Sequence, residues 1–299
     1  MLFRQLEYFV ALAREQHFAR AATACFVSQP ALSEAIRKLE HELGVLLVRR
    51  GSSFEGLTPE GERLVLWARR ILADRQAMQL EVTALRTGLT GELRMGVVPA
   101  AATRAAELAD RFCAAHPLVR VRLESTMHSD RIVDGVRRFE LDVGVVYLNG
   151  VDMEGLTSTL LYQEHHVLVV SSELLHPVGP DTTTWDTVKD LPLCLLHGRM
   201  RQRMRIDEVA SQHGVVLEAR LESDSVATLV AMVSTGRWAS IVPRAWLPLL
   251  RTDPHMCVIE LDGLTLGGPV ALVRNDVRPA PILAAALEAV AVPRVGLTD

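Results

Sequence analysis

The sequence predicts an all-α front segment and an α/β rear region, joined by one long helix. Three observations support this. Residues 1–58 carry short apolar periods of helical spacing, and residues 59–88 carry a single uninterrupted helical pattern. From residue 91 onward, strand-like runs alternate with helix-like runs, which is typical of α/β architecture. We therefore expect a domain over 1–58, a linker helix over 59–88 and a larger domain over 91–299.

The composition bounds the class of protein. The chain has 299 residues, 49% of them hydrophobic, and a net charge of −4, which supports a sizeable core and excludes widespread disorder. No apolar run is long enough to cross a bilayer and the first residues do not resemble a secretory signal, so we expect a cytoplasmic protein with no membrane partner. Cysteines 25, 113, 194 and 257 lack metal-ligand or redox spacing, so we expect free thiols, no metal and no cofactor.

The third predicted helix, about residues 29–43, has two contrasting faces. Ser28 is a good N-cap, Pro30 suits a first turn and Gly44 ends the helix. One face is predicted to be buried, and it consists of Leu32, Ile36, Leu39 and Leu43.

The other face of this helix carries Gln29, Ser33 and Arg37, spaced four residues apart. Gln can pair with adenine, Arg with guanine, and Ser with base edges or phosphate, as on the second helix of a helix-turn-helix. Residues 45–57 predict a hairpin with its tip at 51–53, where Arg49 and Arg50 would meet phosphates or the minor groove. The alternative is an ordinary solvated helix face. Residues 1–88 hold 12 basic and 10 acidic side chains, a weak electrostatic signal for nucleic acid.

A helix of about 30 residues follows, begun by Thr58 and Pro59 and stopped by Gly88. Its apolar residues recur every seven positions, and Trp67 and Val82 widen the stripe formed by Leu64, Ile71, Met78 and Leu85. A stripe this long must be buried, and a second subunit is the simplest partner. The alternative is packing against the C-terminal domain of the same chain.

Beyond residue 91 we expect mainly parallel sheets. The expected strands are 92–98, 119–124, 141–147, 165–171, 193–196, 217–221 and 239–242; the expected helices are 100–116, 129–139, 203–213, 225–235 and 281–290.

Several motifs of the first 61 residues resemble the winged helix-turn-helix of LysR-type transcriptional regulators: Leu6-Glu-Tyr-Phe9, Phe18-Ala-Arg-Ala-Ala22, Val27-Ser-Gln-Pro-Ala-Leu-Ser33, Ile36-Arg-Lys-Leu-Glu40, Leu43-Gly44 and Leu57-Thr-Pro-Glu-Gly61. The sequence departs from the family where Cys25 replaces a frequent Leu and where Leu46 and Val48 stand for Pro and Phe. The resemblance implies a homodimer, usually assembled into a homotetramer, that binds double-stranded operator DNA and contacts RNA polymerase if it is an activator.

The resemblance also implies an effector domain like periplasmic solute-binding proteins, with lobe I over about 91–161 and 265–299 and lobe II over about 162–264. A small molecule would bind between the lobes, near helix N-termini. The segments expected to converge contain Pro99, Ala100, Ala101, Thr103, His128, Ser129, Tyr147, His197, Gly198, Arg199, Met200 and Arg203. Arg199, Arg201, Arg203 and Arg205 form a dense cluster that suits a carboxylate; the alternative is a solvated helix start.

Two other functions fit the sequence less well. An enzyme would need catalytic residues, but the chain has no G-x-S-x-G, Walker A, G-x-G-x-x-G or H-E-x-x-H motif. A transport protein would not need the first 88 residues. We therefore expect an effector-responsive transcriptional regulator with no catalytic residue.

Overall fold

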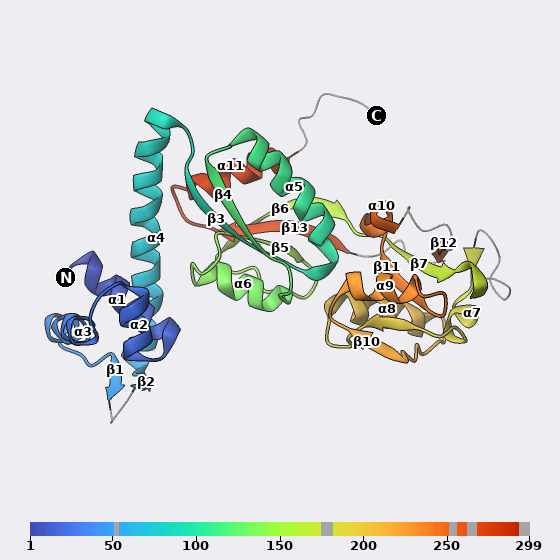
Figure 1. The fold of residues 1–299 in the computed structure, drawn as a ribbon, viewed down its shortest axis with the longest axis horizontal. Helices are drawn as coiled ribbons and strands as arrows, with labels where there is room; N and C mark the ends of the chain where they lie inside the picture. Colours follow the sequence, from blue (N-terminus) through green and yellow to red (C-terminus); the bar gives the residue numbers. More distant parts are fainter. Residues whose placement is uncertain (51–53, 175–181, 251–255, 262–267, 293–299) are drawn as a thin grey trace. The chain divides into compact units, whose positions relative to one another are not determined.

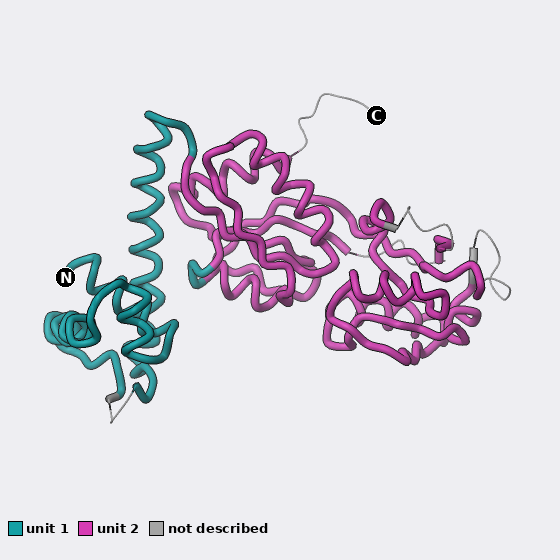
Figure 2. Tube along the Cα trace, viewed as in Figure 1, with its two compact units in different colours: residues 1–89, 138–140 teal, residues 90–137, 141–299 magenta. Residues whose placement is uncertain are grey.

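The computed structural model describes residues 1–50, 54–174, 182–250, 256–261 and 268–292. The chain, drawn as a ribbon in Figure 1, divides into two compact units, which Figure 2 shows in different colours. Unit 1 comprises residues 1–89 and 138–140, and unit 2 comprises residues 90–137 and 141–299.

Unit 1 is helical apart from one hairpin. Its elements are α1 (Phe3–Glu15), α2 (Phe18–Ala24), α3 (Gln29–Leu43), β1 (Val48–Arg50), β2 (Phe54–Leu57) and α4 (Pro59–Thr87). Helices α1, α2 and α3 pack on one another, and α1 also packs on α4. Phe9, Leu12, Leu32, Ile36 and Leu39 are fully buried at the centre of this core.

The predicted helix ends of unit 1 are confirmed. The Ser28 hydroxyl accepts from the Ala31 N–H at 3.4 Å, and Gly44 ends α3 with a φ of 70°. The Thr58 hydroxyl accepts from the Gly61 N–H at 3.0 Å and begins α4. One core residue differs from the prediction: Leu43 is 39% exposed, because it lies in the last turn of α3, just before the chain leaves the helix.

The hairpin is tied to the helices by buried backbone contacts. Glu40, 5% exposed, accepts from the backbone N–H groups of Leu47 and Val48 at 3.0 and 3.2 Å. Gly61 packs so closely against the Leu47 carbonyl that a Cβ there would collide with it. The carboxylate of Glu40 is therefore a structural acceptor rather than part of the exposed charge of this unit.

Unit 2 contains two large sheets, one in each lobe. The first has the strand order β4-β3-β5-β13-β6. Strand β3 (Gly91–Val97) runs parallel to β4 (Val119–Glu124) and β5 (Val143–Tyr147). Strand β13 (Pro269–Asn275) runs antiparallel to β5 and to β6 (Leu156–Gln163). Helices α5 (Ala102–Ala115) and α11 (Ile282–Ala291) cover one face and α6 (Ser129–Arg137) covers the other (Figure 1). The short helix η1 (Pro99–Ala101) precedes α5.

The second sheet has the order β11-β7-β12-β8, formed by β7 (His166–Ser171), β8 (Thr182–Thr183), β11 (Ala239–Pro243) and β12 (Met256–Leu261). A parallel pair, β9 (Cys194–Leu196) and β10 (Leu221–Ser223), lies beside it. The helices of this lobe are η2 (Ser172–Leu174), α7 (Trp185–Lys189), α8 (Arg201–Gln212), α9 (Val226–Val233), η3 (Arg244–Trp246) and α10 (Leu247–Leu250).

Strand β7 is buried on both faces. Leu168 and Val170 belong to one apolar cluster, while Val167 and Val169 belong to another, as the alternation of a strand requires.

The sheets differ from the prediction in three ways. Both large sheets are mixed rather than mainly parallel, because β13 and β7 run antiparallel to their neighbours. The strand expected at 217–221 begins only at Leu221, where the chain comes into register with Cys194 of β9. Strands β6, β8, β12 and β13 are not among the predicted strands. All four cysteines are free, as the sequence predicted.

Candidate functional site

Helix α3 separates its two faces as predicted. Leu32, Ile36 and Leu39 are fully buried, whereas Gln29 and Arg37 are exposed and Ser33 is partly exposed. Ser28 and Pro30 are exposed at the start of the helix. Opposite its buried residues, α3 therefore presents an exposed and largely polar face.

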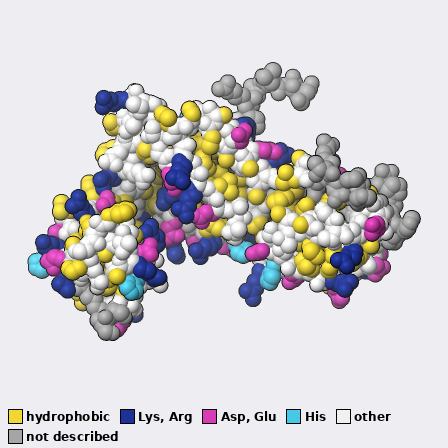
Figure 3. All heavy atoms as spheres, in the orientation of Figure 1, with side chains coloured by type: hydrophobic (Ala, Val, Ile, Leu, Met, Phe, Trp, Pro, Cys, Tyr) yellow, Lys and Arg dark blue, Asp and Glu magenta, His cyan; other side chains and the backbone are white. Residues whose placement is uncertain are grey.

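Among the described residues, Arg37 pairs with Glu34, with 3.5 Å between Nη1 and Oε2, and both side chains are more than half exposed. Pairs of this kind contribute little to stability, so the guanidinium can change partners at small cost. Arg49 is exposed on β1. Arg50 ends β1, but its side chain and the predicted hairpin tip at 51–53 lie outside the described residues. In the face shown in Figure 3, basic and acidic side chains are interspersed over unit 1, consistent with its weak net charge.

The apolar stripe of α4 divides into two parts. Leu64 and Ile71 pack against the core of unit 1 in the same chain. Trp67, Met78, Val82 and Leu85 are 60%, 61%, 59% and 85% exposed. Part of the stripe therefore packs within unit 1 itself, and the rest is exposed on the described chain.

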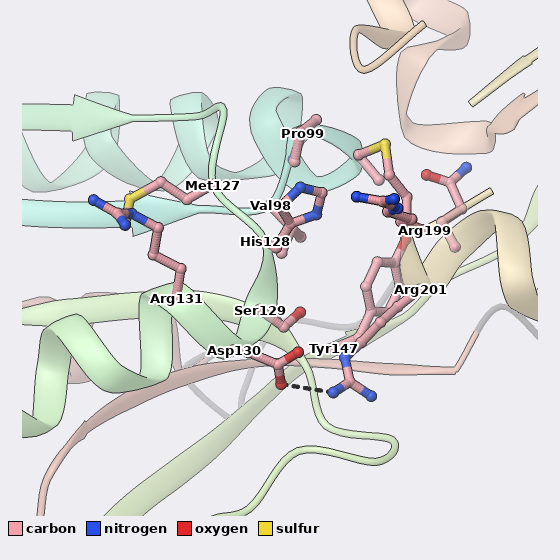
Figure 4. Close-up of a pocket in the computed structure, with 13 residues that line it drawn as sticks. Val98, Pro99, Met127, His128, Ser129, Asp130, Arg131, Tyr147, Arg199 and Arg201 are labelled. Atoms are coloured by element: carbon pink, nitrogen blue, oxygen red, sulfur yellow. Dashed lines mark hydrogen bonds and ion pairs between the residues drawn. The ribbon is translucent and has the colours of Figure 1, made fainter. Parts of the chain in front are cut away.

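A cavity of about 380 Å³ lies in unit 2 (Figure 4). Its walls come from the end of β3 and η1, the segment before α6 and its first turn, the end of β5, and the start of α8. The lining residues are Val98, Pro99, Ala100, Met127, His128, Ser129, Asp130, Arg131, Tyr147, Arg199, Met200, Arg201 and Gln202.

Seven of the effector residues expected from the sequence line this cavity together: Pro99, Ala100, His128, Ser129, Tyr147, Arg199 and Met200. Five others do not line it. Ala101 is buried at the end of η1, and Thr103 follows in the first turn of α5. His197 and Gly198 lie in the exposed turn before α8, where the His197 Nδ1 accepts from the Arg199 N–H at 3.2 Å. Arg203 is the fifth predicted residue that does not line the cavity.

Arg203 faces the interior of its lobe instead. It is 6% exposed and donates to Asp207, Glu222 and the carbonyls of Leu196 and Leu217. Its guanidinium therefore ties α8 to β9 and β10, and it is a structural group.

Arg201 and Arg199 are the cluster members at the cavity. Arg201 donates to the Asp130 carboxylate at 2.6 Å and to the Asn149 carbonyl at 2.9 Å, as the dashed line in Figure 4 marks for Asp130. Arg199 is exposed at the cavity wall. Ser129 begins α6 and Arg201 begins α8, so the free N–H groups of two helix starts lie at one cavity, an arrangement that favours anions.

Three buried side chains of the cavity wall have unsatisfied polar atoms. Among the described residues, the Ser129 hydroxyl, the Tyr147 hydroxyl and both amide atoms of Gln202 have no hydrogen-bond partner. Buried polar groups are almost always paired, by protein, water or ligand. The sequence prediction missed Asp130 and Gln202, which follow Ser129 and Arg201 at the starts of α6 and α8, and it also missed Val98, Met127 and Arg131.

A buried carboxyl group lies where the chain crosses between the lobes, between β6 and β7. Glu164 is 2% exposed; it accepts from the Tyr162 hydroxyl at 3.2 Å and from the His165 N–H at 3.0 Å. Burial raises its pKa to about 7, an effect that these bonds and Arg104 only partly oppose. The pKa of Tyr147, at the cavity wall, is also raised, mainly by burial of its hydroxyl and to a smaller extent by the charge of Glu164.

The described residues contain no group of three potential metal-ligating side chains, and none of their helices is long and apolar enough to cross a membrane.

Comparison with known families supports a two-part organisation. A model described as a bacterial regulatory helix-turn-helix protein of the lysR family matches residues 3–62. A second model, the LysR substrate binding domain, matches residues 86–292.

Curated relatives are similar over most of the chain. A probable hydrogen peroxide-inducible genes activator of Streptomyces viridosporus is 32% identical, covering 80% of this chain and 76% of the relative. The HTH-type transcriptional regulator EstR of Acinetobacter baylyi is 32% identical, covering 87% of this chain and 86% of the relative.

Solved structures share the fold. A full-length OxyR variant from Pseudomonas aeruginosa has a TM-score of 0.76 at 25% identity, covering 97% of this chain and 94% of that chain. CbnR in complex with its target DNA has a TM-score of 0.66 at 24% identity, covering 97% of this chain and 99% of that chain.

Proposed function

The chain belongs to the LysR-type transcriptional regulators, a DNA-binding family rather than an enzyme family, and we propose that its cavity binds a small carboxylate effector that controls operator binding. One observation carries the proposal. Buried polar groups of Ser129, Tyr147 and Gln202 have no partner in the described residues, and they line a cavity that also contains Arg199 and Arg201. A carboxylate would satisfy the buried donors and the guanidinium groups together.

On the DNA side, the proposed contacts are Ser28, Gln29, Pro30, Ser33, Arg37, Arg49 and Arg50. The exposed face of α3 supports this proposal because Gln29 and Arg37 have the chemistry for reading base edges. The proposed assembly is a homodimer formed through the exposed apolar side chains of α4, with a homotetramer as the larger form. If the protein activates transcription, we propose that it also contacts RNA polymerase.

The effector part is tested by thermal denaturation with small monocarboxylates, each compared with its neutral amide. We expect an acid to raise Tm more than its amide, and Arg199→Gln to reduce that difference. Arg205→Gln is the matched control, because Arg205 belongs to the same cluster but does not line the cavity. Equal shifts for every acid and amide would contradict the proposal.

The DNA part is tested by selecting sequences from a randomised duplex library. We expect the wild-type protein to enrich one motif and Gln29→Ala to weaken binding to it by about tenfold, with no change in assembly. Enrichment of no motif would refute the operator role.

A further inference from the structure

The turn between α2 and α3 holds a bulky aromatic residue in an unfavourable backbone conformation. Helix α2 ends at Ala24, and Phe26 follows with a φ of 56°. The Phe26 N–H donates to the Thr23 carbonyl at 3.1 Å, and the Val27 N–H donates to the Ala22 carbonyl at 3.0 Å. Helices that end in this way usually place Gly at the left-handed position, since a Cβ is penalised there.

Packing does not account for the aromatic ring. Phe26 is 96% exposed, the largest exposed fraction among the large hydrophobic residues described. The neighbouring Val27 is partly buried and packs against the core of unit 1, so the turn is anchored without Phe26. A residue that is both strained and unburied is a candidate for a functional role.

The location of Phe26 suggests what covers it. It lies two residues before Ser28, the N-cap of α3, and three before Gln29, so the chain places it next to the N-terminal end of the proposed DNA-reading face. In helix-turn-helix proteins the N-terminal residues of the second helix meet the major groove. The apolar groups available there are the C5 methyl of thymine and the edge of deoxyribose, and Phe can contact the methyl.

We propose that Phe26 is a direct operator contact that packs its ring against an apolar edge of the DNA next to the bases read by α3. The inference rests on the proposed DNA-binding face. The unfavourable turn is then retained because the ring gains its contacts only when DNA is bound.

Two substitutions separate a DNA role from a structural one. Phe26→Gly and Phe26→Asn both suit a left-handed residue, so we expect an unchanged or higher Tm. We expect each variant to bind the selected duplex about tenfold more weakly than the wild type does. Leu118→Asn is the control for loss of an exposed apolar side chain, since Leu118 is 61% exposed in unit 2.

A thymine-to-deoxyuridine scan of the same duplex identifies the contact. If the ring meets a methyl, one substitution weakens wild-type binding and leaves Phe26→Asn binding unchanged. If the ring contacts deoxyribose, each deoxyuridine substitution changes the affinity of both proteins equally, while Phe26→Asn binds every duplex more weakly than the wild type does.

Three results would overturn the inference: wild-type affinity in both variants, a lowered Tm in both, or weaker binding explained by loss of the dimer in sedimentation. Failure of the wild type to select any sequence would instead refute the proposed function on which the inference rests.

Discussion

The two proposed recognition regions are built differently. The DNA contacts proposed on α3 and at its N-cap lie in one stretch of the chain, residues 28–37, whereas the walls of the cavity come from four separate segments between residues 98 and 202. The polar groups of α3 face solvent, where they cost the fold little. Those of the cavity are buried, and Ser129, Tyr147 and Gln202 have unpaired atoms among the described residues. Polar side chains that could bind a ligand therefore lower the stability of the fold where they are buried, in the cavity, and hardly affect it where they face solvent, on α3.

Arg203 and Arg199 give the sharpest contrast. Arg203→Met should lower the free energy of unfolding by about 3 kcal/mol, because it leaves Glu222 and two backbone carbonyls without their buried partner. Arg199→Met should change it by less than about 0.5 kcal/mol, because Arg199 is exposed. Urea denaturation of both variants measures the difference. Equal losses would mean that the two arginines are not divided between structural and cavity roles.

Glu164 should make stability depend on pH. Its folded pKa, about 7, lies above its ordinary value of 4.5, so the folded state holds the proton more tightly. This contribution is fully present below about pH 4.5 and is lost as pH rises through 7, a change of at most about 3 kcal/mol. Glu164→Gln cannot ionise, so its stability relative to wild type should rise between pH 5 and pH 8. A constant difference across that range would contradict the assigned pKa.

Helix α4 can be tested along its length. Val82→Asp should weaken dimerisation by about 2 kcal/mol and leave the fold intact, because Val82 is 59% exposed within its own chain. Leu64→Asp should lower Tm, because Leu64 packs against the core of unit 1. Sedimentation and thermal denaturation distinguish the two effects. A dimer that tolerates Val82→Asp would exclude this part of the stripe from the interface.

The smallest expected effect is a gain. Tyr147→Phe removes a buried hydroxyl that has no partner among the described residues, and it should raise the free energy of unfolding by up to about 1 kcal/mol. Gln29→Ala, on an exposed face, should leave it unchanged. Chemical denaturation in the absence of small molecules provides the comparison. A loss of stability in Tyr147→Phe would mean that the hydroxyl is already satisfied.

Local signals account for what could be predicted in unit 1. Ser28 and Thr58 begin helices and Gly44 ends one, each through contacts within a few residues, and the period of Leu32, Ile36 and Leu39 sets the buried face. The polar face of α3 follows from that period, because the residues opposite a buried stripe must face solvent. The family resemblance added the operator role.

The cavity could be predicted only in part. The sequence located the helix starts at Ser129 and near Arg201, and the resemblance brought them together. The sequence could not show that Arg203 is buried while Arg199 and Arg201 line the cavity, because no local signal indicates which side of α8 packs on β9 and β10. Glu164 gave no local signal, since its burial arises where two strands from different sheets are joined.

The sequence alone therefore determined where helices begin and end and which face of α3 is polar, because these depend on neighbours within about one or two helical turns. Tertiary structure decided which arginine is a buried tie, which polar groups are left unpaired, and which part of the α4 stripe stays exposed. Those outcomes depend on the order of strands and on contacts between residues far apart in the chain.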